Sequence, residues 1–238
     1  MIKYGIDVSE HQGNIAWNET AKHIDYAIIR AGLGRYSTQV DKYFQSNYDR
    51  AKAAGVPIGA YWYSYAMSAD EARLEAAACL EVIKGKQFEY PIYFDVEEQS
   101  VLALGRGKIC EIINAFCSEL EKAGYFVGVY MSAYPLTNLT DDRIKSRYAV
   151  WVAHYDVDKP SYNYKYGMWQ KSSKGKIDGI GVNVDLDECY IDYPKHIKEA
   201  GDNGFVKPEP APEPQKKSMK VTIEYDDHIY SGLLEEQL

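Results

Sequence analysis

The feature that most constrains the fold is an alternation of two kinds of segment along the first two-thirds of the chain. Short segments rich in β-branched and aromatic residues predict strands, and longer ones whose apolar residues recur every three or four positions predict helices. Repeated strand–helix–strand units are typical of a parallel sheet. We expect strands at residues 2–7, 26–31, 56–63, 90–95 and 126–131, and helices at residues 42–54, 69–83 and 108–123.

Two helix–strand junctions repeat one pattern. Residues 54–61 and 123–130 share the spacing A-G-x-x-x-G-x-Y. A glycine that follows an alanine-rich helix is typical of a left-handed C-cap, after which the chain turns into the next strand. We interpret the two segments as copies of one structural unit; a chance similarity between the junctions would leave the predicted fold unchanged.

The pattern changes after residue 131, where strands at 148–153, 166–170 and 183–187 are joined by segments with little room for a long helix. This makes eight strands, the number that closes a small barrel. The predicted fold class is therefore α/β: an irregular (β/α) barrel of eight mostly parallel strands, with reduced helix cover over the last three.

The C-terminal region has a different composition. The barrel domain is predicted to span residues 1–205, a Pro/Glu-rich linker residues 206–217, and a short tail residues 218–238. In the tail, Val221, Ile223 and Tyr225 alternate with polar residues before a turn at Asp226 and Asp227, which predicts a β-hairpin. An isolated hairpin is marginal in water. We therefore expect it to dock on the barrel, self-associate or bind another molecule such as cell wall, the alternative being a frayed tail.

Composition excludes several classes of function. The formal charge of -8 argues against a basic surface for nucleic acid. No apolar run approaches the roughly 20 residues that span a bilayer, and the N-terminus lacks a basic region followed by an apolar stretch, so neither membrane binding nor an export signal is expected. The four cysteines form no C-x-x-C pair, and Cys110 and Cys117 are interpreted as core thiols. We expect no metal and no cofactor.

Carboxylates occur at three predicted strands. Asp7 ends the first strand, Asp95 ends the fourth with Glu97 two residues beyond, and Asp185 lies in the last. In a parallel barrel the carboxyl ends of the strands meet at one face, where catalytic groups gather, and the first and last strands are neighbours. We expect Asp7 beside Asp185, with Asp95 and Glu97 facing them.

The i, i+2 spacing of Asp95 and Glu97 keeps the two side chains within about 7 Å of each other. Because like charges that close disfavour joint ionisation, one pKa should rise, which keeps a carboxylic acid protonated for donation to a glycosidic oxygen. Glu97, with the longer side chain, is our candidate for this acid. Glu98 and Asp187 are assigned to capping or surface roles. Arg30, inside an apolar run, should pair with one of the four site carboxylates.

Aromatic residues are abundant, with 22 tyrosines and 4 tryptophans. Sugar-binding grooves need flat apolar surfaces with polar tips. Tyr63, Tyr130, Trp151 and Tyr155 lie at or near strand ends and are candidate stacking walls, the alternative being barrel core. Trp62, of opposite parity to Tyr63, should pack under a helix.

Several segments together resemble glycoside hydrolase family 25, the muramidases (lysozymes) of phage endolysins and bacterial autolysins. They are GIDVSEHQGNIAW at residues 5–17, YAIIRAGLG, GAYWYSY, YFDVE, WVAHY at residues 151–155, and MWQ followed by GIGVNVDLD. The resemblance covers about residues 3–193. It implies cleavage of the β-1,4 bond between N-acetylmuramic acid and N-acetylglucosamine of a peptidoglycan glycan strand.

The resemblance also implies site roles: Glu97 is similar to the proton donor, and Asp7, Asp95 and Asp185 to the other acids. Two departures stand out. Asp187 replaces the Asn of the family pattern V-D-x-N, and Glu10-His11 stands where many members have His-Trp.

The second mechanistic role stays open. Carboxyl groups about 5 Å apart imply a direct nucleophile, a wider gap implies an inverting water, and the 2-acetamido groups of the substrate allow substrate assistance with Asp95 orienting the amide. We favour net retention by substrate assistance.

A non-catalytic peptidoglycan-binding module and a chitin-directed hydrolase are the competing functions. Without an export signal, we expect a phage lysin made in the cytoplasm that reaches the wall through a permeabilised membrane, or an enzyme acting outside the cell.

Overall fold

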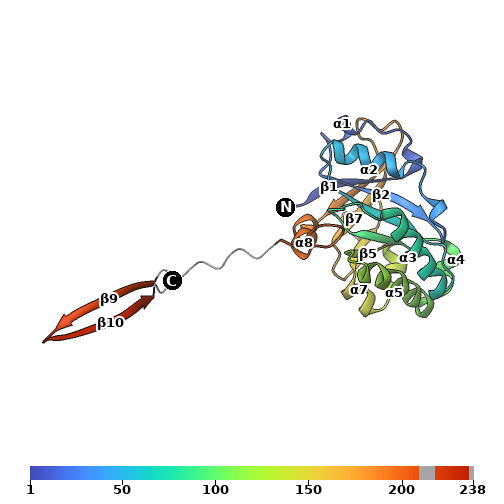
Figure 1. Cartoon of the computed structure of the whole chain (residues 1–238). Helices are drawn as coiled ribbons and strands as arrows, with labels where there is room; N and C mark the ends of the chain where they lie inside the picture. Colours follow the sequence, from blue (N-terminus) through green and yellow to red (C-terminus); the bar gives the residue numbers. More distant parts are fainter. Residues whose placement is uncertain (209–217, 236–238) are drawn as a thin grey trace. The chain divides into compact units, whose positions relative to one another are not determined.

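The computed structural model describes residues 1–208 and 218–235, and the chain divides into two units, Met1–Lys207 and Pro208–Leu238. The predicted linker lies mostly outside the described residues. In the first unit eight strands close a barrel in sequence order, which confirms the predicted fold class (Figure 1). The strands are β1 (Lys3–Val8), β2 (Tyr26–Leu33), β3 (Ile58–Tyr63), β4 (Ile92–Asp95), β5 (Val127–Ser132), β6 (Ala149–Ala153), β7 (Met168–Gly175) and β8 (Val184–Cys189).

One strand runs against the others. Neighbours from β1 to β7 pair in parallel, whereas β8 is antiparallel to both β7 and β1. The connection at residues 176–183 is too short for the crossover that a parallel pair needs. The expectation that Asp185 lies close to Asp7 is confirmed, but it was reasoned from parallel strands, and β8 is not parallel to β1. Asp185 lies at the start of β8, and the reversed direction brings that start to the end of the barrel where β1 to β7 finish.

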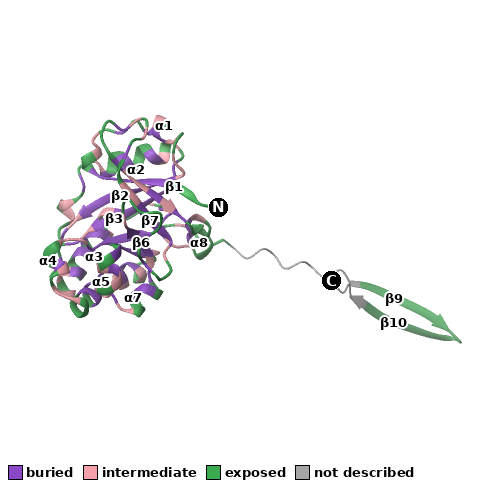
Figure 2. Cartoon of the chain, turned by 180° about the vertical axis from the view of Figure 1, so that it is seen from behind, coloured by how far each residue is buried: buried purple, intermediate pink, exposed green. Residues whose placement is uncertain are grey.

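Helices cover the barrel unevenly, as predicted. Long helices follow β2, β3 and β4, only short ones follow β5, and none of the described residues between β6 and β8 is helical (Figure 1). Figure 2 shows the barrel strands largely buried and the outward surfaces of the helices around them exposed. The helices are α1 (Trp17–Thr20), α2 (Phe44–Ala53), α3 (Ala69–Ile83), α4 (Gln99–Leu102), α5 (Arg106–Lys122), α6 (Ala133–Asn138), α7 (Asp142–Arg147) and α8 (Tyr193–Ala200), with 3-10 turns η1 (Glu10–Gln12) and η2 (Ser37–Gln39).

Local sequence explains where the helices begin and end. Ser68 precedes α3, and its side chain accepts a hydrogen bond from the Glu71 N–H, which satisfies one of the free donors of the first turn. Gly55 after α2 and Gly124 after α5 have φ values of 75° and 81°. Both conformations favour glycine, and each lets the chain reverse into the next strand, in agreement with the repeated unit interpreted from the sequence.

The core has two layers, one between the strands and the helices and one inside the barrel. In the outer layer Phe94 stacks on Phe116 at 3.9 Å between ring centroids, and Trp62 is fully buried. The inner layer is filled mainly by aromatic rings. Gly128 makes this possible, because a Cβ there would lie 2.3 Å from the ring of Tyr93. The barrel is therefore a packed core beneath its mouth. All four cysteines are free and buried, including Cys110 and Cys117 as predicted.

The second unit is the predicted hairpin. Strands β9 (Ser218–Tyr225) and β10 (His228–Glu235) pair antiparallel. The turn residues Asp226 and Asp227 have φ values of 51° and 59°, the left-handed pair that suits a tight two-residue hairpin turn. Ile223, Tyr225 and Tyr230 are exposed on it. Within the described part of the chain, no helix is both long and apolar enough to span a membrane.

Candidate active site

A cavity of about 240 Å³ opens at the end of the barrel where β1 to β7 finish. Every residue that the sequence analysis selected lines it. The selected residues are Asp7, Arg30, Tyr63, Asp95, Glu97, Tyr130, Trp151, Tyr155 and Asp185, and the cavity is completed by Ser9, His11, Gln12, Tyr61 and Gln170.

Strand register sets the positions of the acids. Asp7 pairs directly with Asp185 across β1 and β8, so these two side chains are neighbours on the inner face of the barrel. Asp95, the last residue of β4, lies between Tyr63 of β3 and Tyr130 of β5. Glu97 follows in the connection to α4 and is only partly buried. Four carboxyl groups from three distant stretches of sequence thus meet in one cavity.

Asp7 and Asp185 form an acidic pair with shifted titration. Burial raises the pKa of Asp7 well above its usual range, and the charge of Asp185 adds to this. A hydrogen bond of 2.6 Å from Gln170 Nε2 to Asp7 Oδ2 opposes the shift, because it stabilises the carboxylate. Burial also raises the pKa of Asp185, to about 6.

Asp95 and Glu97 are the second pair. Burial raises the pKa of Asp95 well above its usual range, with the charges of Glu97 and Asp7 adding to it and Arg30 opposing. Burial also raises the pKa of Glu97, followed by the charges of Asp185 and Glu98. Asp95 Oδ1 is buried without a hydrogen-bond partner among the described residues. A buried acceptor of this kind favours either a proton on the carboxyl group or a donor from a bound ligand.

Gln170 links the acids to the tyrosines and was missed by the sequence analysis. Its Oε1 accepts hydrogen bonds from Tyr130 Oη at 2.7 Å and Tyr155 Oη at 2.5 Å, while its amide nitrogen holds Asp7. The sequence did contain a signal for Gln170. It ends the MWQ segment and lies two residues after Met168 in the same strand, so its side chain is expected on the same face as Met168, which points into the barrel. The amide thus fixes the positions of Tyr130, Tyr155 and Asp7.

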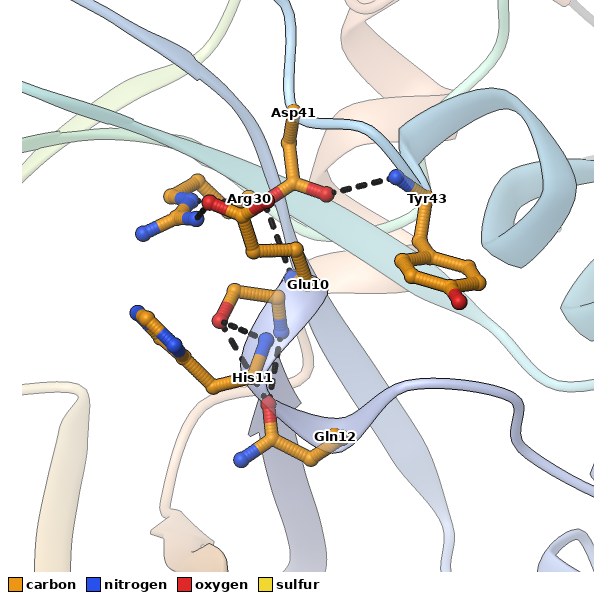
Figure 3. A network of polar contacts seen from close by, with 7 residues as sticks. Glu10, His11, Gln12, Arg30, Asp41 and Tyr43 are labelled. Carbon is orange, nitrogen blue, oxygen red and sulfur yellow. Dashed lines mark hydrogen bonds and ion pairs between the residues drawn. The ribbon is translucent and has the colours of Figure 1, made fainter.

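The predicted pairing of Arg30 was wrong. Arg30 Nε lies 2.7 Å from Asp41 Oδ2 and its Nη2 lies 2.9 Å from Glu10 Oε1 (Figure 3), so among the described residues its ion pairs are with these two carboxylates and not with the four selected acids. Asp41 also accepts hydrogen bonds from the N–H groups of Glu10 and Tyr43. These contacts of Arg30 hold η1 and the loop after η2 against β2. The charge of Arg30 also acts on Asp95 in the cavity, whose pKa it lowers.

Asp187 was also misjudged, because it is not a surface charge but 1% exposed. Trp151 Nε1 donates a 2.8 Å hydrogen bond to Asp187 Oδ1, and Oδ2 has no partner among the described residues. Burial raises the pKa of Asp187 well above its usual range, and the charge of Asp7 adds to this. Alternation along β8 places Asp185 and Asp187 on the same inner face. A neutral Asp187 presents the charge and shape of the Asn expected from the family pattern.

The aromatic candidates divide into a floor and walls. Trp151 and Tyr130 are 1% and 5% exposed and form the floor, with their rings 4.5 Å apart. Tyr155 is 39% exposed and Tyr63 is partly buried, so these two rings present usable faces. Tyr63 Oη donates to Glu98 Oε2 at 3.2 Å, which gives Glu98 a place at the rim.

Comparison with known protein families identifies the family of this chain. Residues 6–180 match the family described as Glycosyl hydrolases family 25. The chain belongs to glycosyl hydrolase family 25. The matched segment contains Asp7, Asp95 and Glu97 but ends before Asp185, which the structure brings beside Asp7.

Family 25 relatives share the fold as well as the sequence. The chain is 30% identical over 191 residues to the autolytic lysozyme of Clostridium acetobutylicum, covering 77% of this chain and 55% of that one. The CTP1L endolysin structure is 29% identical with a TM-score of 0.73, covering 82% of this chain and 69% of that one. A family 25 glycosyl hydrolase from Bacillus anthracis is 27% identical with a TM-score of 0.68, covering 79% and 89%. The chain thus spans little more than half the length of the autolytic lysozyme that it matches.

The acids of this family 25 cavity do not form a metal site of usual spacing. Across residues 1–208 and 218–235, the group whose ligand atoms converge closely enough for an ion is Glu19, His23 and Asp178, and none of these residues is buried.

Proposed function

We propose that this chain is an N-acetylmuramidase that hydrolyses the β-1,4 bond between N-acetylmuramic acid and N-acetylglucosamine in bacterial peptidoglycan. The observation that carries the proposal is the meeting of Asp7, Asp95, Glu97 and Asp185 in one tyrosine-lined cavity, each with a raised pKa. Membership of family 25 and the likeness to an autolytic lysozyme support it. The proposed site of action is the bacterial cell wall.

Glu97 is the proposed general acid. Burial, Asp185 and Glu98 all raise the pKa of Glu97, so its carboxyl group keeps its proton to a higher pH than a free glutamic acid does. Its position beyond the end of β4 leaves the side chain partly open to the cavity. The proton passes from the Glu97 carboxyl group to the glycosidic oxygen as the bond to the departing N-acetylglucosamine breaks.

Asp95 is the proposed partner of the 2-acetamido group. An amide N–H from the sugar bound at the cavity would supply the donor that Asp95 Oδ1 lacks. That hydrogen bond would stabilise the Asp95 carboxylate, lower its pKa and leave the proton on Glu97. The oriented amide oxygen bonds to the anomeric carbon from the opposite side as the glycosidic bond breaks. Water then attacks that carbon, gives a proton to the Glu97 carboxylate and reopens the ring, with net retention.

Asp7 and Asp185 have a supporting electrostatic role in this scheme. Positive charge develops on the sugar ring in an oxocarbenium-like transition state, and carboxylates in a water-poor cavity stabilise such charge. Gln170 keeps Asp7 in place and favours its ionised form. Tyr63 and Tyr155 are the proposed walls for sugar rings, Trp151 and Tyr130 form the floor, and Arg30 orders η1 at the rim.

Mass spectrometry of the fragments released from purified cell walls tests the proposal. A muramidase leaves N-acetylmuramic acid at the new reducing ends, and Glu97→Gln should abolish the release. N-acetylglucosamine at those ends would contradict the proposed bond. Binding to walls without release would favour a non-catalytic binding module, and equal turnover of chitin oligomers would favour a chitin-directed hydrolase.

A further inference from the structure

Two more cavities flank the catalytic one at the mouth of the barrel. The first, here called the α6 cavity, has about 370 Å³, and its lining includes Tyr134, Asn138, His154, Tyr155 and Ser161. Tyr155 lines both this cavity and the catalytic one, so the two are adjacent. The second, here called the α3 cavity, has about 330 Å³ and includes Tyr36, Tyr65, Glu71 and Glu75. It adjoins the catalytic cavity through Tyr65, whose ring centroid lies 5.1 Å from that of Tyr63.

Charge distinguishes the two flanking cavities. The α6 cavity is lined by hydroxyl, amide, imidazole and phenol groups and has no carboxylate in its lining. The α3 cavity contains Glu71 and Glu75, and the single arginine that lines it, Arg35, is already paired with Glu71 at 3.2 Å. With four acids in the catalytic cavity as well, an anionic group meets the least repulsion in the α6 cavity.

His154 is held rigidly in the α6 cavity. Its backbone N–H donates to Gln170 O, its carbonyl accepts from Trp169 Nε1 at 2.8 Å, and its ring Nδ1 accepts from the Ser161 N–H at 3.0 Å. Because Nδ1 is an acceptor, the neutral ring carries its proton on Nε2. Within the described residues Nε2 makes no hydrogen bond, so an oriented donor remains available to a ligand.

The substrate of the proposed function has a part that matches this cavity. The lactyl ether of N-acetylmuramic acid bears a short peptide with amide groups and free carboxylates, and this peptide must leave the sugar next to the catalytic acids. We propose that the α6 cavity binds the peptide stem of a muramic acid whose sugar lies in the catalytic cavity. His154 Nε2 donates to a stem carbonyl or carboxylate, and Tyr134, 76% exposed, covers the stem from the side of α6.

This inference rests on the proposed function, because it needs a peptidoglycan strand in the catalytic cavity. It adds selectivity: strands that carry peptides should be better substrates than bare glycan. Tyr155 stands between the two cavities and would separate the sugar from its stem.

Steady-state kinetics on two substrates test it. Soluble glycan strands are used with their peptides intact and after removal of the peptides by an amidase, and the selectivity is the ratio of the two kcat/KM values. We expect a ratio above one for the wild type, and a fall of about tenfold in His154→Ala and a smaller fall in Tyr134→Ala. Tyr36→Ala, an exposed tyrosine of the α3 cavity, is the matched control and should keep the wild-type ratio.

A binding measurement separates the inference from the activity. In a Glu97→Gln background, calorimetry compares a disaccharide–peptide with the same disaccharide lacking the peptide. His154→Ala should raise the Kd of the peptide-bearing ligand alone. If neither the selectivity nor this Kd difference responds to His154→Ala and Tyr134→Ala in folded protein, the inference is wrong. If the wild type releases no muramic reducing ends, the proposed function fails instead, and the Kd comparison still decides whether the α6 cavity recognises the peptide.

Discussion

The indole N–H of Trp151 donates a 2.8 Å hydrogen bond to a carboxyl group, Asp187 Oδ1, that is 1% exposed and lies behind the catalytic cavity. Burial and the nearby charge of Asp7 raise the pKa of Asp187 well above its usual range. This contact connects the floor of the cavity to the acid pair of β1 and β8. Burial favours the neutral form of Asp187, the counterpart of an asparagine, and outweighs the opposing effect of the Trp151 hydrogen bond on the pKa.

Asp187→Asn should therefore keep activity within about threefold of wild type, because the substitution preserves the Trp151 contact and the neutral charge. Its effect on stability should depend on pH. When folding raises the pKa of a carboxyl group, the free energy of unfolding falls as the pH rises from the unfolded-state pKa towards the folded-state pKa. Thermal unfolding of the variant should match the wild type below about pH 4 and exceed it increasingly towards pH 7. A difference that is constant with pH would show that Asp187 is not held neutral.

Glu97→Gln should lower kcat by about 10²- to 10⁴-fold, the usual contribution of a general acid. Glu98→Gln is the matched control, because Glu98 is the next residue and binds only the Tyr63 hydroxyl at the rim. Release of reducing sugars from purified walls measures both variants. A larger loss in Glu98→Gln than in Glu97→Gln would reverse the two assignments.

Asp185→Asn should move the alkaline limb of the pH–activity profile to lower pH. The charge of Asp185 is the second cause, after burial, of the raised pKa of Glu97. Removing that charge makes Glu97 lose its proton more easily, so the protonated acid is lost at a lower pH. The alkaline limb should be measured in the pH dependence of kcat/KM, which reports the pKa values of the free enzyme. Asp178→Asn, outside the cavity, should leave the limb in place, and an unmoved limb in Asp185→Asn would contradict the coupling.

Arg30→Ala should destabilise the fold by about 3–5 kcal/mol, because it leaves the fully buried Asp41 carboxylate without its partner. Arg147→Ala removes an exposed ion pair with Glu121 and should cost below about 1 kcal/mol. Urea unfolding of the two variants gives the comparison. Equal decreases in the free energy of unfolding would mean that the buried Arg30–Asp41 pair stabilises the fold no more than the exposed Arg147–Glu121 pair does.

Local pattern in the sequence was enough for much of the fold. The predicted helix at residues 69–83 coincides with α3, and the alternation at Val221, Ile223 and Tyr225 identified the hairpin. These features depend on side-chain period, capping and turn residues that lie within a few positions of one another. The positions of Asp7, Asp95 and Asp185 in their strands likewise predicted that these three acids line one cavity.

The same local reasoning failed where a side chain depends on distant partners. The partner of Arg30 is Asp41, which follows β2 in an irregular loop that has no periodic pattern. Gln170 contacts Asp7 across 163 positions of sequence, and the local pattern around Gln170 can indicate that its side chain points into the barrel but not which residue it contacts there.

Hydrophobic period and turn chemistry are local properties, so they were enough to identify the segments that form strands and helices and the acids near the strand ends. The direction of β8, the burial of Asp187 and the raised pKa values of the acids follow from the folded barrel. Closure of the barrel joins β8 to β1 and removes water from their carboxyl groups, and desolvation is a property of the assembled surroundings and not of the residue.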